Sequence, residues 1–217
     1  MRGDVLVIQS HHRAAAAQIA DLLIDRLSVD SERAAVGIAG ESGSGKSELA
    51  AALQAALTEC SVSSVILQQD DYFRLPPRSN DARRRSDIAW VGPQEVDLDR
   101  LDRDVITVVR GASQLEKPLV LYDENRITTE TLQTSACRAV LVEGTYVSLL
   151  SSPSVRIFID RDYHQTLEAR RVRHREAFDP FIERVLEVEH TIIRPHRERA
   201  DILVTEDYSV REIDPGS

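Results

Sequence analysis

The chain has 217 residues and a formal net charge of −9, with 42% hydrophobic and 29% charged residues. This length is sufficient for one α/β domain with its own core, and we expect a single domain over 1–217. The acidic balance argues against nucleic acid as a partner, and no apolar run approaches the ~18–20 residues that a membrane span needs. The two cysteines, Cys60 and Cys137, lack metal-ligand or redox spacing, and the N-terminal stretch lacks a secretion signal, so we expect a cytoplasmic protein.

The first part of the chain contains a predicted helix, a strand and a second helix. Apolar residues at helical spacing predict a packing helix over Gln18–Leu27, inside an N-terminal extension of residues 1–33. The apolar run Ala34–Ala39 is typical of a short buried strand, and the Ala- and Leu-rich segment Ser47–Cys60 predicts a helix. A strand and a helix therefore flank the glycine-rich stretch between them.

That stretch, Gly40–Ser47 (GESGSGKS), fits the phosphate-binding loop (P-loop) pattern G-x-x-x-x-G-K-[S/T]. Its glycines let the backbone turn tightly and bring N–H groups against phosphate oxygens, and the following helix adds its dipole. Lys46 can reach the β and γ phosphates, and the Ser47 hydroxyl can bind Mg²⁺. A chance match in a glycine-rich turn is disfavoured by the flanking strand and helix. We therefore predict that ATP or another nucleoside triphosphate, with Mg²⁺, is bound by Gly40, Glu41, Ser42, Gly43, Ser44, Gly45, Lys46, Ser47 and Glu48.

Two aspartates follow the second predicted buried strand, Ser63–Gln69. Functional side chains of an open parallel sheet collect where the strands end at their carboxyl edge. Successive residues of an extended chain point to opposite sides, so only one of Asp70 and Asp71 is expected to face the phosphates. That residue would accept a proton from a substrate hydroxyl or help to hold Mg²⁺. Helix-capping aspartates in a solvated turn are the alternative.

The segment Arg74–Asp87 has two prolines and few core residues, so we predict a loop or mobile flap. Its arginines could grip phosphate or carboxylate groups, or equally form a solvated charge run or a contact within a homo-oligomer. The arginines concerned are Arg74, Arg78, Arg83, Arg84 and Arg85. A turn at Gly92-Pro93 then introduces a helix within Trp90–Gly111, whose carboxylates we expect to be exposed.

The segment Lys117–Glu130 is predicted to form a hairpin-like or extended excursion, on which Tyr122 and Arg126 are able to touch a ligand. The next buried strand, Arg138–Gly144, carries Glu143 at its tip. A carboxylate at the end of a buried strand beside a phosphate-binding loop is well placed to bind Mg²⁺ directly or through water. We therefore predict a metal role for Glu143.

A basic stretch follows the predicted strand Val155–Asp160, over the helical segment Asp162–Ala177. In a nucleotide kinase, a basic segment that closes over the transferred phosphoryl group supplies positive charge where negative charge develops in the transition state. We predict this role for Arg170, Arg171, Arg173 and Arg175, with an exposed helix held by i,i+4 pairs as the alternative. A helix around Phe181–Ile193 and a last strand, Ala200–Glu206, precede a polar tail.

Together these motifs resemble the uridine kinase / phosphoribulokinase family of P-loop kinases, in the family's order: GESGSGKS, QDDYFR, YD with an arginine, VEGTY and FID…RRV. The resemblance covers about Ala34 to Thr205. It implies a P-loop NTPase-type three-layer α/β/α domain with a mostly parallel sheet and a helical lid over 162–177. It also implies that Asp70 is the general base, and that Ser47 and Glu143, with Asp70, hold Mg²⁺.

Further site residues follow from the same resemblance. The segment Pro195–Asp201 is similar to the one that lies near the nucleotide base in the family. The candidate substrate contacts are Tyr72, Phe73, Arg74, Tyr122 and Arg126.

Three positions depart from the family's pattern, and one of them is His174 in the lid, where an arginine is often found. Uridine kinases carry an aspartate in an N-[WF]-D-x-P stretch where this chain has Val91, and YDENRI lacks the histidine that normally follows YD. We therefore expect complete phosphoryl-transfer machinery acting on a hydroxyl of a small molecule, a nucleoside or a nucleoside-like acceptor. The alternatives are a kinase for a phosphorylated or acidic small molecule, and an ATP-binding regulator without a small-molecule acceptor.

Overall fold

The computed structural model describes residues 6–28, 33–166 and 179–213. The lid arginines Arg170, Arg171, Arg173 and Arg175 lie outside the described residues, so their role stays a prediction. Within the described ranges, no helix has both the length and the apolar character that crossing a bilayer requires.

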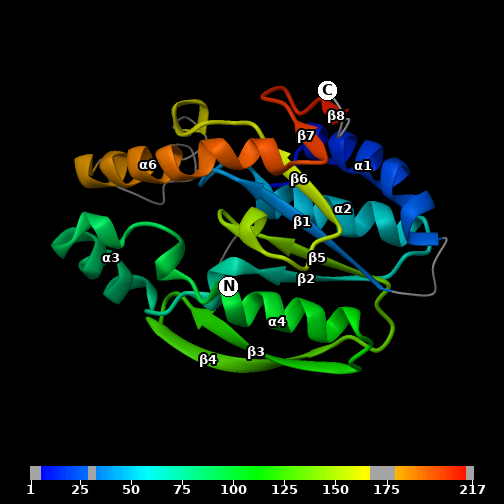
Figure 1. Ribbon diagram of the computed structural model, residues 1–217, viewed down its shortest axis with the longest axis horizontal. Helices are drawn as coiled ribbons and strands as arrows, with labels where there is room; N and C mark the ends of the chain where they lie inside the picture. The colour runs from blue at the N-terminus through cyan, green and yellow to red at the C-terminus, as the bar shows by residue number, and fades with distance from the viewer. Residues whose placement is uncertain (1–5, 29–32, 167–178, 214–217) are drawn as a thin grey trace.

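A six-stranded sheet forms the centre of the molecule (Figure 1). Its spatial order is β2-β5-β1-β6-β7-β8, and all neighbours run parallel except β7 and β8. Because β1 lies between β5 and β6, the loop after β1 is flanked by the carboxyl ends of both neighbours, the usual position of a ligand site in such sheets. The strands are β1 (Ala34–Gly40), β2 (Ser64–Gln68), β5 (Ala139–Glu143), β6 (Val155–Ile159), β7 (Ile202–Val204) and β8 (Val210–Glu212).

Helices and a hairpin cover the two faces of the sheet. The helices are α1 (Ser10–Ser28), α2 (Lys46–Glu59), α3 (Pro77–Ser86), α4 (Leu98–Val109) and α6 (Pro180–Ile193). The hairpin consists of β3 (Gln114–Leu121) and β4 (Arg126–Gln133). Short 3₁₀ helices are η1 (Gln69–Tyr72), η2 (Ile88–Trp90), η3 (Pro93–Glu95), η4 (Val147–Leu149) and η5 (Arg194–Arg199).

The alternation of side chains along the strands divides the core in two. Val36 and Ile38 of β1 belong to the cluster formed with α1 and α2, whereas Ala35 and Ala39 belong to the cluster formed with α4 and the start of the hairpin. In Figure 1, α1 and α2 lie along one face of the sheet, and α4 with the hairpin lies along the other. The predicted three-layer α/β/α fold with a mostly parallel sheet is therefore confirmed.

The expectation of a loop over Arg74–Asp87 is wrong, because the structure contains helix α3 there. Pro77 occupies its first turn, where a missing N–H has no cost, and the Asn125 side chain from the hairpin tip accepts a hydrogen bond from the Arg78 N–H at 2.8 Å. Arg85 and Asp81 form an i,i+4 ion pair at 2.8 Å on its surface. The helix is held by caps and polar contacts rather than by an apolar face, which is why its hydrophobic pattern gave no signal.

Three other expectations need correction. The strand β2 is an edge strand with only Leu67 fully buried, not a buried central strand. The polar tail contains β8, which pairs antiparallel with β7. Among the carboxylates expected to be exposed, Glu95 is completely buried, because it accepts hydrogen bonds from the Gly92 N–H and from neighbouring side chains.

Candidate active site at the carboxyl edge of the sheet

The P-loop Gly40–Ser47 connects β1 to α2 with a backbone that requires glycine. Gly43 and Gly45 have φ values of 82° and 97°, in the left-handed region where a side chain would be strained. Gly45 directly precedes α2, so the N-terminus of this helix opens onto the loop. The Lys46 ammonium group donates to the Glu41 carbonyl oxygen at 2.9 Å, which folds this cation back over the loop. Backbone N–H groups and a cation that converge in this way can hold phosphate groups.

Two side-chain oxygen atoms that could bind a metal ion lie close together at the first turn of α2. Ser47 Oγ donates to Glu143 Oε1 at 3.0 Å, so the side chain at the tip of β5 reaches the loop. Burial, together with the nearby Asp70 carboxylate, raises the pKa of Glu143 to about 7 against the opposing effect of Lys46. Hydroxyl and carboxylate oxygens are the hard ligands that Mg²⁺ prefers, so the residues present fit this ion.

Asp70 and Asp71 face different partners, as expected, although they lie in the 3₁₀ helix η1 rather than in an extended chain. Asp70 is partly buried; burial raises its pKa, and the nearby Lys46 ammonium group opposes that rise. Asp71 is fully buried and accepts from Lys117 Nζ at 2.6 Å and from a backbone N–H of β3 at 3.0 Å. Only Asp70 is therefore available to a ligand at the P-loop, while Asp71 anchors the hairpin.

Three of the candidate substrate contacts, at the end of η1 and directly after it, pack towards α4. Tyr72 is buried in the core, and its hydroxyl donates to Asp104 of α4 at 2.9 Å. Phe73 forms a backbone bridge to the residue before the α4 cap, and Arg74 lies 3.7 Å from the cap itself, Asp97. These contacts give all three residues a structural partner on the α4 side.

The other two substrate candidates lie where the hairpin turns. Tyr122 is 55% exposed, and Arg126 forms an exposed ion pair with Glu124 at 2.7 Å. Arg78 Nη2 also donates to the Asp123 carbonyl oxygen at 3.3 Å, so the hairpin turn contacts α3. Among the described residues, no hydrogen bond or ion pair joins Tyr122 or Arg126 to the P-loop.

Helix α6 contacts two consecutive side chains of the P-loop. Ser42 Oγ donates to Glu189 Oε2 at 2.7 Å, and His190 Nδ1 lies 2.6 Å from Glu41 Oε1. Sequence reasoning missed both α6 residues, because the apolar spacing of α6 indicates only a packing helix. Burial raises the pKa of Glu41 against the opposing effect of His190, so this carboxylate sits in a poorly solvated position at the loop.

Arg84 of α3 lies at the centre of a second network that sequence reasoning also missed. Its Nε donates to Glu95 Oε2 at 2.6 Å, and its Nη2 lies 3.5 Å from Glu189 Oε1. Asn80 donates to the same Glu95 oxygen and accepts from Trp90 Nε1 at 2.8 Å. The network connects α3 and η3 to α6, and through Glu189 to the P-loop.

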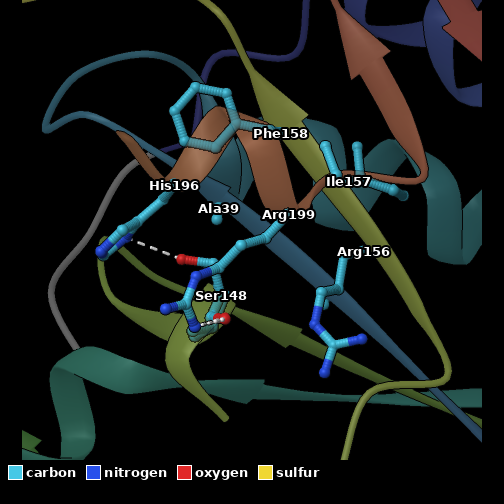
Figure 2. A pocket seen from close by; sticks show the side chains of 10 residues that line it. Ala39, Ser148, Arg156, Ile157, Phe158, His196 and Arg199 are labelled. Atoms are coloured by element: carbon cyan, nitrogen blue, oxygen red, sulfur yellow. Dashed lines mark hydrogen bonds between the residues drawn. The ribbon is translucent and has the colours of Figure 1, made fainter. Parts of the chain in front are cut away.

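The segment Pro195–Asp201 lines a small cavity over the middle of β1 and β6 (Figure 2). His196 Nδ1 and Ser148 Oγ are 2.8 Å apart at its wall, and Arg199 points into the same region. The cavity volume is about 10 Å³, room for no more than about one water molecule. The cavity is therefore too small for a nucleotide base, and the expected placement of this segment near the base stays a prediction.

Comparisons with known proteins give a family match and several similar proteins. A family model described as "Phosphoribulokinase / Uridine kinase family" matches residues 35–206. Two curated relatives are similar: the bifunctional alpha-galactosidase/sucrose kinase AgaSK of Mediterraneibacter gnavus (28% identity over 83% of this chain) and the uridine kinase of Leuconostoc citreum (25% identity over 79% of this chain and 86% of that protein). The chain spans only 21% of the length of the first relative.

A solved structure has the same fold. The putative fructose transport system kinase from Silicibacter sp. TM1040 matches with a TM-score of 0.66 and 20% identity, over 84% of this chain and 94% of that chain. At this level of identity the likeness concerns the fold alone.

Proposed function

Because the chain belongs to the phosphoribulokinase / uridine kinase family, we propose that it transfers the γ-phosphate of ATP to a hydroxyl group of a neutral, hydroxyl-rich small molecule, a nucleoside or a sugar. The single observation that carries this proposal is the position of Asp70, partly buried and electrostatically coupled to Lys46 and Glu143. A base, a cation and a metal-binding carboxylate around one phosphate-binding loop form the minimal set for phosphoryl transfer to an alcohol.

Each group then has a role. Asp70 accepts the proton of the acceptor hydroxyl as the hydroxyl oxygen forms a bond to the γ-phosphorus, the bond from that phosphorus to the β–γ bridging oxygen breaks, and ADP leaves. The raised pKa of Asp70 makes it a stronger base than an exposed aspartate. Lys46 neutralises charge on the β and γ phosphates, and Ser47 and Glu143 hold Mg²⁺. A Mg²⁺ ion held by these two residues would supply positive charge to the phosphate groups. The arginines of the lid, Arg170, Arg171, Arg173 and Arg175, are proposed to stabilise the transferred group.

The partners of the α3 arginines support a neutral acceptor over a phosphorylated or acidic one. An anion-binding cluster needs arginines whose charge is available, but four of the five arginines from Arg74 to Arg85 have a carboxylate partner, and Arg78 donates to a carbonyl oxygen. The partners are Asp97 for Arg74, the Asp123 carbonyl for Arg78, Asp87 for Arg83, Glu95 and Glu189 for Arg84, and Asp81 and Asp179 for Arg85. The names of the two curated relatives, a uridine kinase and a sucrose kinase, refer to uncharged, hydroxyl-rich acceptors.

The test is a coupled nucleotide-consumption assay over nucleosides, sugars and sugar phosphates, carried out with the wild type, Asp70→Asn and Asp99→Asn. Asp99 is exposed on α4 and serves as a matched control for loss of one carboxylate charge. We expect turnover of an uncharged acceptor, a fall in kcat of about 10²–10⁴ in Asp70→Asn, and unchanged kcat in Asp99→Asn.

Two results would contradict the proposal. Full activity of Asp70→Asn in the best assay would show that Asp70 is not the general base. Preferential turnover of sugar phosphates would support the alternative of a kinase for a phosphorylated or acidic acceptor. Tight ATP binding without turnover of any acceptor would favour a nucleotide-binding regulator instead.

A further inference from the structure

Two segments outside the family match meet behind the P-loop. The match covers residues 35–206, whereas His12 lies in α1 and Tyr208 lies between β7 and β8. Both side chains are buried, with 4% and 6% of their surface exposed, and Figure 1 shows α1 beside β8 at the same end of the molecule. The N-terminal helix therefore does more than cover the sheet, because its first turn reaches the back of the nucleotide loop.

A directional chain of hydrogen bonds runs from α1 to the loop. The Gln9 N–H donates to His12 Nδ1 at 3.0 Å, so this nitrogen is an acceptor and the neutral ring carries its proton on Nε2. That Nε2–H faces Tyr208 Oη at 3.1 Å and His11 Nε2 at 3.2 Å. The Tyr208 hydroxyl in turn donates to the Ser44 carbonyl oxygen at 2.7 Å.

Two further contacts fix the tyrosine. Arg161 Nη1 donates to Tyr208 Oη at 3.2 Å, and the His11 ring lies against the Tyr208 ring with centroids 4.3 Å apart. A Cβ atom at Gly45 would collide with the Tyr208 hydroxyl and lie 3.1 Å from His12 Nε2. The loop backbone is thus pressed directly against these two side chains, which is possible only with glycine at position 45.

The bond to Ser44 sets the direction of a loop N–H group. In a planar trans peptide, the carbonyl oxygen and the following N–H point in opposite directions. Because the Ser44 carbonyl points back to Tyr208, the Gly45 N–H points away from α1 and β8. That is the direction in which a phosphate-binding loop must present its N–H groups.

We propose that Tyr208, supported by His12, is a positioning residue for nucleotide binding: it holds the Ser44–Gly45 peptide so that its N–H faces the phosphates. This inference rests on the proposed use of the P-loop for a nucleoside triphosphate, but not on the identity of the acceptor. It gives the segments outside the family match a role in nucleotide affinity.

The test measures the dissociation constant of Mg²⁺·ATP by calorimetry for the wild type, Tyr208→Phe and Thr134→Val. Thr134 is a matched control, because its buried hydroxyl also donates to a backbone carbonyl, that of Ala112, at the far end of the hairpin. Each variant loses one hydroxyl–carbonyl bond, and Tyr208→Phe also loses the contacts of its hydroxyl with His12 and Arg161, so we expect the larger shift of the urea midpoint in Tyr208→Phe. Only Tyr208→Phe should weaken Mg²⁺·ATP, by about tenfold, with KM for ATP raised and kcat little changed.

A second pair of variants guards against loss of folding in Tyr208→Phe. His12→Ala keeps the tyrosine and the bond from Arg161 but removes the bond from His12, and it should weaken Mg²⁺·ATP by a smaller factor. His12→Gln, which retains an amide donor, should restore part of the affinity. Unchanged ATP affinity in Tyr208→Phe, or equal weakening in Thr134→Val, would overturn the inference. A wild type that binds ATP without phosphorylating any acceptor would overturn only the proposed function, and a wild type that does not bind ATP would overturn both.

Discussion

Arg84 Nη2 of α3 lies 3.5 Å from Glu189 Oε1 of α6, and the other carboxylate oxygen of Glu189 accepts from Ser42 in the P-loop. The buried carboxylate of Glu189 therefore connects the P-loop, which would hold the nucleotide, to helix α3. Arg84 needs this partner as well as Glu95, because a partly buried guanidinium group is costly to leave uncompensated.

This relationship predicts energetic coupling between positions 84 and 189. We expect Arg84→Gln and Glu189→Gln each to lower the free energy of unfolding, and the double variant to lose about 1 kcal/mol less than the sum, as contacting charges do. The measurement is urea unfolding in a double-mutant cycle. Glu187, exposed on the same helix, provides the control pair with Arg84, and its coupling should not exceed roughly 0.5 kcal/mol. Equal coupling in the two cycles would contradict the prediction.

The buried ion pair between Lys117 and Asp71 predicts a large loss on breaking it. Lys117 Nζ also lies 2.8 Å from Glu130, so the cation serves two carboxylates. Lys117→Met should cost about 3–5 kcal/mol of unfolding free energy, because Asp71 would remain charged and buried. Arg126→Met removes an exposed ion pair in the same hairpin and should cost less than about 1 kcal/mol in the same urea experiment. A small loss in Lys117→Met would show that Asp71 is solvated.

His196 predicts a fall in stability on mild acidification. Burial and the nearby Arg199 lower the pKa of His196 below its usual value. The folded protein therefore favours the neutral ring, so the contribution to stability is present above about pH 6.5 and is lost as the pH falls below that value towards the folded-state pKa. His196→Asn, which keeps an acceptor for Ser148, should reduce the change in urea midpoint between pH 7.5 and 5. His164→Gln, at an exposed histidine, should show the same change in urea midpoint as the wild type. If His196→Asn also showed the wild-type change, His196 would not be the source of the pH dependence.

Tyr146 predicts a stabilising substitution. Its side chain is 1% exposed, and its hydroxyl has no hydrogen-bond partner among the described residues. A buried polar group without a partner carries a desolvation cost, so Tyr146→Phe should raise the free energy of unfolding by about 1 kcal/mol. Tyr72→Phe is the contrasting variant, because that hydroxyl is bonded to Asp104, and it should lower stability. Destabilisation in Tyr146→Phe would mean that the hydroxyl is bonded in solution.

The parts of the fold that sequence could predict are those with a local pattern. The apolar runs at β1, β5 and β6 and the periodicity of α4 and α6 come from residues that are buried in their own element, so a short window contains the signal. The P-loop is equally local, since its glycines act through their own backbone and the Lys46 ammonium group donates to the Glu41 carbonyl within the same loop.

Features set by distant contacts could not be predicted in this way. Helix α3 buries only Asn80 and depends on a cap from Asn125, which lies in the hairpin turn 47 positions after Arg78. The burial of Glu95 depends on Arg84 and Asn80, which lie more than ten residues away in sequence, as well as on the nearby Gly92 N–H. Within the site, the strand tips located Asp70 and Glu143, but the contacts from α6 and from Tyr208 require the folded chain.

The hairpin has a buried part next to Asp70 and an exposed turn that carries two of the predicted substrate contacts, Tyr122 and Arg126. Strand β3 of the hairpin is held by the buried ion pair between Lys117 and Asp71, and Asp71 is next in the chain to Asp70, the proposed proton acceptor. The turn of the hairpin, with Tyr122 and Arg126, is exposed. Substitutions of the exposed side chains of Tyr122 and Arg126 are therefore expected to leave the Lys117–Asp71 pair in place.

The turn as a whole is not independent of the site, because Asn125 accepts from the Arg78 N–H and the Asp123 carbonyl accepts from Arg78 Nη2. A turn grafted from a relative would therefore have to keep both contacts to α3, the helix that carries Arg84.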